Sequence, residues 1–191
     1  DDELYTASQI DQILNPKPLF SFSAISDIHL QVDDKINDNN GHDDLIQLFK
    51  CLKNRIDKKG LNLSYICCAG DIGMEGKENE LKTFSELVKA TCPIDQSRVA
   101  SCCGNHDQQH GAEVWNQYMF SDSTRENATE DRNYSFVDGD FVFAFMSLAN
   151  QNDRNHCVQG RICYLDDSKC STKTWLENLV EESENKTLIL F

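Results

Sequence analysis

Short apolar runs alternate with amphipathic segments along the first half of the chain. Each apolar run has the length of a buried strand, and each amphipathic segment repeats its apolar residues at helical spacing. The predicted strands are residues 20–26, 64–69 and 98–103, and the predicted helices are residues 42–59 and 78–90. Gly60 and Pro93 are natural helix stops. Strand and helix units in this order predict a parallel α/β layer.

The second half of the chain has a different pattern. Residues 134–137 and 140–148 flank an Asp138-Gly139 turn and predict a β-hairpin. Residues 150–171 are polar and predict a surface loop. Thr174 and Glu177 have the spacing of a capping box and predict a helix. Its expected inward residues are Trp175, Leu176, Leu179 and Val180, and residues 187–191 form a last predicted strand.

Polar clusters follow directly on each of the first three predicted strands. They are Asp27-Ile28-His29, Gly70-Asp71 and Gly104-Asn105-His106-Asp107. Because the carboxyl ends of parallel strands share one edge of a sheet, we expect the three clusters to meet there. Carboxylate and amide oxygens mixed with imidazole suit Mn, Fe or Zn better than Ca or Mg. The sequence therefore predicts a transition-metal site at this edge.

These three motifs, in this order, resemble the first three motifs of the calcineurin-like metallophosphoesterase superfamily. The resemblance extends over residues 20–191, which we take as the domain, with residues 1–19 as an N-terminal extension. It implies a four-layer α-β-β-α sandwich of two mixed sheets flanked by helices. It also implies a hydrolase that cleaves phosphate mono- or diesters with a water activated at a dinuclear metal centre.

The resemblance assigns a role to each motif residue. The implied ligands of two divalent or trivalent ions (Mn, Fe or Zn) are Asp27, His29, Asp71 and Asn105, with Asp71 bridging the two. His106 matches a catalytic histidine that contacts the phosphate and protonates the leaving oxygen. Asp107 is expected to orient His106 through its other ring nitrogen.

The chain departs from the superfamily pattern in two places. Met74 stands where the second motif often carries Asp or Asn. The later histidine motifs, which end in Gly-His-x-His, do not occur before Phe191. We therefore expect the natural chain to be longer and the fold to be incomplete at its C-terminus. Of the other histidines, His42 and His156 are predicted to be surface residues, and His110 is a weak candidate for lining the site.

Composition limits the partners. The net charge is −14 with no basic stripe, which argues against nucleic acid and leaves a phosphorylated small molecule or nucleotide as the expected substrate. No apolar run is long enough to span a membrane. The chain has four Asn-x-Ser/Thr sequons and nine cysteines, of which Cys157, Cys163 and Cys170 occupy the loop-like stretch. These features leave cytoplasmic, secreted and lysosomal locations open.

Two other functions compete with the hydrolase. One is a non-catalytic binding or scaffold module on the same fold, which the lack of the later histidines favours. The retained motif residues argue against it, because no structural role requires that set. The other is a doubly wound nucleotide-binding protein. It fits the first half of the chain, but no Gly-x-Gly-x-x-Gly turn follows the first strand.

Overall fold

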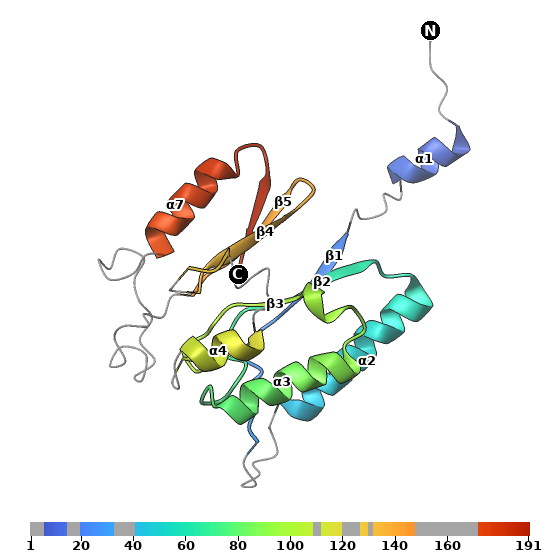
Figure 1. Ribbon diagram of the computed structural model, residues 1–191. Coiled ribbons are helices and arrows are strands. Elements are labelled where there is room, and N and C mark those ends of the chain that lie inside the picture. Colours follow the sequence, from blue (N-terminus) through green and yellow to red (C-terminus); the bar gives the residue numbers. More distant parts are fainter. Residues whose placement is uncertain are drawn as a thin grey trace.

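The computed structural model describes residues 6–14, 20–32, 41–108, 112–119, 127–129, 132–147 and 172–191. Within these residues the chain is an α/β protein with five helices and two three-stranded sheets (Figure 1). The helices are α1 (Ala7–Leu14), α2 (His42–Lys59), α3 (Glu78–Thr91), α4 (Ala112–Met119) and α7 (Thr172–Glu182). The strands are β1 (Ser21–Ile25), β2 (Leu63–Cys68), β3 (Val99–Ser101), β4 (Tyr134–Asp138), β5 (Phe141–Phe145) and β6 (Thr187–Leu190). The predicted loop 150–171, His110 and His156 lie outside the described residues.

The first sheet has the strand order β1-β2-β3 and is parallel throughout its described strands. This confirms the parallel layer predicted from the strand and helix units, since each crossover contains a helix that returns the chain to the same end, whereas the resemblance implied a mixed sheet. Helix α2 has the predicted bounds and ends at Gly60, which adopts φ 65°. The residues that α2 and α3 bury in the main core are Leu45, Phe49, Leu52, Leu81, Phe84 and Val88.

The second sheet has the order β4-β5-β6 and is mixed, as predicted. Strands β4 and β5 form the expected antiparallel hairpin, while β6 pairs with β5 in parallel. The hairpin turn is one residue later than predicted, since Asp138 still pairs with Phe141 and the turn residues are Gly139 and Asp140. Gly139 adopts φ 56°, a left-handed conformation that a side chain would disfavour.

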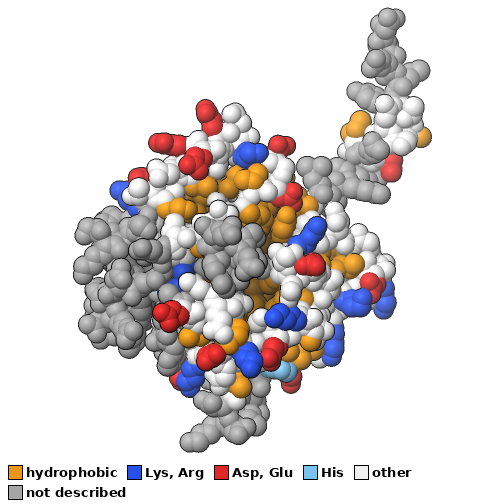
Figure 2. Space-filling view, viewed as in Figure 1, with side chains coloured by type: hydrophobic (Ala, Val, Ile, Leu, Met, Phe, Trp, Pro, Cys, Tyr) orange, Lys and Arg blue, Asp and Glu red, His pale blue; other side chains and the backbone are white. Residues whose placement is uncertain are grey.

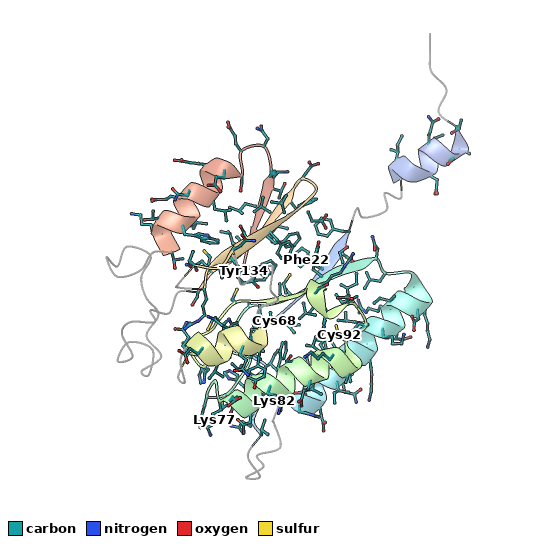
Figure 3. The ribbon with its side chains drawn as sticks, in the orientation of Figure 1. Phe22, Cys68, Lys77, Lys82, Cys92 and Tyr134 are labelled. Carbon is teal, nitrogen blue, oxygen red and sulfur yellow. The ribbon has the colours of Figure 1, made fainter. Side chains whose placement is uncertain are left out.

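Aromatic side chains connect the two sheets. Phe20 makes an edge contact with Phe141 at 4.5 Å between ring centroids, and Tyr65 contacts Phe143 at 5.1 Å. Tyr134 lies between the sheets (Figure 3), where its hydroxyl accepts the Ser101 N–H at 2.9 Å and donates to the Ser101 carbonyl at 3.1 Å. This one hydroxyl therefore satisfies both backbone groups at the end of β3.

Helix α7 covers part of the second sheet and forms a separate small core. Leu179 packs with Val142 and Ala144, and Trp175 lies against them. Val180, predicted to face inward, is 54% exposed. The predicted capping box is also wrong: the helix begins at Thr172, so that Thr174 lies inside it.

Two helices, α1 and α4, were not predicted. Helix α4 contributes the fully buried Trp115 to the main core, and α1 leaves Ile13 and Leu14 exposed. On the face seen in Figure 2, hydrophobic side chains gather in a band across the middle, with charged side chains around it. None of the described helices is long and apolar enough to cross a bilayer.

Candidate metal site and its neighbouring histidine

The loops that follow β1 and β2 continue side by side beyond the strands. The backbone N–H groups of Asp27 and His29 donate to the carbonyls of Gly70 and Asp71, at 3.2 and 3.0 Å. The Leu30 N–H then donates to Ile72 at 2.8 Å. These hydrogen bonds hold the first two motifs next to each other, as predicted from their positions at the ends of neighbouring parallel strands.

Asp27, His29 and Asp71 form one cluster. Each offers a ligand atom, and these atoms all lie within 4.8 Å of one another. All three residues adopt a left-handed backbone, with φ of 54°, 50° and 52°. Such a conformation is uncommon for residues other than glycine and concentrates at functional sites. The local backbone therefore turns the three side chains toward a common point.

The third motif packs directly on this cluster. The His106 N–H donates to Asp71 Oδ1 at 3.0 Å, and the His106 ring meets the His29 ring edge-on at 4.7 Å. Gly104 makes the approach feasible, since a Cβ there would lie 2.3 Å from the Asp71 nitrogen. Asn105 is half-buried in the same turn, between Gly104 and His106. The structure thus gathers the motif residues at one edge of the parallel sheet.

The role expected for Asp107 is filled by another group. The Asp107 carboxylate is fully buried and accepts the Gly73 N–H at 2.8 Å and the Gly104 N–H at 3.0 Å. His106 instead has its Nδ1 on the Met74 carbonyl, 2.5 Å away. Asp107 therefore ties the second and third motif loops together and does not orient the imidazole. Burial raises the pKa of Asp107 to about 7, against the opposing effect of these backbone amides.

The cluster fits a transition-metal ion. Buried His29 Nδ1 has no hydrogen-bond partner among the described residues, although such an atom normally has one. Ligand atoms that share an ion lie at most about 4.4 Å apart, because each bond is about 2.0–2.2 Å long. The three ligand atoms, all within 4.8 Å of one another, are therefore near the spacing at which they could share one ion. Imidazole with two carboxylates suits Mn, Fe or Zn.

Sequence reasoning missed three residues that shape this site. Glu80 is 3% exposed and accepts two backbone N–H groups from the loop after Asp71. Gly73 and Gly76 let that loop pack closely against Glu80 and Asp107. A signal was present: glycines flank Met74 at short spacing, and Glu80 stands three residues after Lys77, the helix N-cap. His42 pairs with Asp43 at 3.2 Å and is not a member of the Asp27, His29 and Asp71 group.

In this α/β protein, carboxylates and histidines at the ends of parallel strands form a candidate metal site at the edge of a sheet. The family is shown by comparison with known proteins. The chain belongs to the calcineurin-like phosphoesterase family, whose model matches residues 20–191. The chain has no significant match among curated protein sequences. The candidate cluster of Asp27, His29 and Asp71 lies within the matched range.

Proposed function

We propose that this protein hydrolyses phosphate mono- or diesters with the help of two bound metal ions. The observation that carries the proposal is the convergence of Asp27, His29 and Asp71 within 4.8 Å in a chain of the calcineurin-like phosphoesterase family. A cluster of this kind at strand ends has no evident structural purpose, since all three residues adopt an uncommon backbone conformation.

Four residues would hold the metals. Asp27 and His29 are assigned to the first ion, Asn105 to the second, and Asp71 to both. Bound ions of this type supply Lewis acidity toward the phosphoryl oxygens and a nucleophilic water at neutral pH. The His106 N–H donates to Asp71 Oδ1 and so anchors the carboxylate for this role. This hydrogen bond does not involve Asp71 Oδ2.

His106 would protonate the leaving oxygen. It neighbours the cluster through its ring contact with His29, and its Nδ1 is engaged by the Met74 carbonyl. The Nε2 proton is then the one available for transfer. Positioned proton transfer of this kind contributes about 10²–10⁴-fold to rate. Asp107 would support the geometry by joining the second and third motif loops.

We also propose the four-layer α-β-β-α sandwich as the complete architecture. Three sets of contacts support this arrangement: α2 and α3 pack on the first sheet, α7 packs on the second, and aromatic rings connect the two sheets. Residues 1–19 would form an extension outside it. The substrate class that we favour is a phosphorylated small molecule or nucleotide, because the net charge of −14 disfavours long polyanions.

Metal binding is the first test. Mn²⁺ binding is measured by calorimetric titration for the unmodified chain, Asp71→Asn and Asp43→Asn. Asp43 is the matched control, since it also lies beside a histidine but outside the cluster. Asp71→Asn should weaken binding strongly, whereas Asp43→Asn should bind as the unmodified chain does. Equal affinity for all three would refute the assignment of the cluster.

Hydrolysis is then measured with p-nitrophenyl phosphate and bis-p-nitrophenyl phosphate in the presence of Mn²⁺. His106→Asn should lower kcat by about 10²–10⁴-fold while Mn²⁺ still binds. Metal binding without hydrolysis of either ester would instead support the binding or scaffold module. Hydrolysis that is unaffected by His106→Asn would refute the role of His106 as the acid.

A further inference from the structure

The Met74 carbonyl is the group that holds the His106 ring. Met74 belongs to the loop from Gly73 to Lys77, which connects the second motif to helix α3. Its N–H donates to the Leu30 carbonyl at 3.0 Å, and its own carbonyl accepts from His106 Nδ1. The orientation of the imidazole therefore depends on where this short loop places one peptide group.

Glu80 fixes the loop from the helix side. One carboxylate oxygen, Oε2, accepts both the Glu75 N–H at 3.0 Å and the Lys77 N–H at 3.1 Å. Both N–H groups belong to residues that follow Met74 in the loop. Glu80 therefore fixes the path of the loop backbone immediately after the Met74 carbonyl. Glu80 can approach only because Gly73 lacks a side chain, since a Cβ there would lie 2.8 Å from Oε2.

The opposite side of the loop is packed against Asp107. Gly73 donates its N–H to the Asp107 carboxylate, and a Cβ on Gly76 would lie 2.4 Å from the Asp107 carbonyl oxygen. Gly76 adopts φ 67°, which a glycine tolerates best. The loop is thus held between two acidic residues that come from different parts of the chain.

We propose that Glu80 is a positioning residue for His106, acting through the Met74 carbonyl. A helix-capping glutamate at this place would need only the Lys77 N–H, the usual partner of an acid at the third helical position. The additional bond to Glu75 reaches past the helix start to the residue next to Met74. The catalytic consequence rests on the proposed function, whereas the structural consequence does not.

The consequence for His106 concerns its protons. A carbonyl oxygen can only accept, so Nδ1 must carry a hydrogen in both the neutral and the charged imidazole. In the neutral ring the hydrogen is thereby on Nδ1, and Nε2 carries the lone pair. Without the Met74 carbonyl in place, the neutral ring could carry its hydrogen on either nitrogen.

The test is the tautomer of His106, read from long-range ¹H–¹⁵N NMR spectra at pH 8.5 without added metal and assigned through His106→Asn. The unmodified chain should show the Nδ1–H tautomer, and Glu80→Ala a mixture. Glu80→Gln should restore the Nδ1–H form, because one amide oxygen can accept both N–H groups. Glu78→Ala removes an exposed acid from the same helical turn, bonded to Tyr118, and should leave the tautomer unchanged.

If Glu80→Ala does not fold, Glu80→Asp replaces it, since its shorter side chain keeps the charge but withdraws the oxygen from the loop. An Nε2–H tautomer in the unmodified chain, or an unchanged tautomer in the folded Ala or Asp variant, would overturn the proposal. Where ester hydrolysis is present, the same variants should lower kcat by about 10–100-fold with little change in KM. Absence of hydrolysis throughout would refute the proposed function and leave the tautomer result standing.

Discussion

Replacing Gly104 by alanine tests whether the third motif must touch Asp71. A Cβ at this position would lie 2.1 Å from Asp71 Oδ1 and 2.3 Å from the Asp71 nitrogen. The carboxylate could rotate away, but the backbone nitrogen could not. Real Cβ contacts essentially never fall under 3.0 Å, so the two motif loops must separate by about 0.7 Å.

The expected magnitudes follow from this displacement. Forcing an extra methyl group into a packed site costs about 1–3 kcal/mol, which is about 2–12 °C in Tm for a chain of this size. Because Asp71 would shift relative to Asp27 and His29, we expect Mn²⁺ affinity to fall by about 10–100-fold. The methyl group would also displace Asp71 Oδ1 from the place where it accepts the His106 N–H.

Gly60→Ala is the control for stability. No atom lies within 4 Å of a Cβ there, but Gly60 has φ 65°, so alanine should cost about 1–2 kcal/mol through the backbone alone. The two variants should therefore unfold at comparable temperatures while only Gly104→Ala loses metal affinity. Calorimetric titration with Mn²⁺ and thermal unfolding by circular dichroism provide both quantities. A folded Gly104→Ala variant with unchanged affinity would refute the reasoning.

Three further perturbations have defined outcomes. Tyr134→Phe leaves both backbone groups of Ser101 unsatisfied and should lower the free energy of unfolding by about 2–4 kcal/mol in urea titrations. Tyr65→Phe removes only an exposed bond to Asp138 and should cost under about 1 kcal/mol; equal costs would contradict the assigned burial. Burial raises the pKa of Cys67 to about 12, so its stabilising contribution is complete below pH 9 and is lost as pH rises from 9 to 12. Between pH 8 and 10 this amounts to about 1.4 kcal/mol, which Cys67→Ala should remove from the pH dependence of unfolding; an unchanged dependence would contradict it. Removing Mn²⁺ present at about 100 times its Kd should reduce stability by about 2.7 kcal/mol, and an unchanged Tm would argue against specific binding.

Local patterns in the sequence were sufficient for much of the fold. The bounds of α2 follow from its apolar spacing and from Gly60, and the hairpin follows from two apolar runs around an Asp-Gly turn. The motif positions follow equally well, because parallel strands must end at one edge. These features depend on residues that are near one another in the chain.

The errors concern contacts between distant residues. Thr172, not Thr174, begins α7, and its hydroxyl bonds the Ser147 carbonyl 25 residues away. Asp107 was expected to serve its neighbour His106 but instead binds Gly73, on a different loop. Asn133 shows the same limit: its sequon suggests a glycosylation site, yet the side chain is fully buried and bonded to Thr172. No periodicity in the sequence indicates such pairings.

The two separate hydrophobic cores can be followed independently by tryptophan fluorescence. Its only tryptophans are divided between them: Trp115 is fully buried in the main core, and Trp175 of α7 packs against the small core. Emission from Trp115 thus follows the main core, to which both sheets contribute, and emission from Trp175 follows the small core between α7 and the second sheet. With either indole replaced by phenylalanine, the remaining signal shows which of the two cores loosens first.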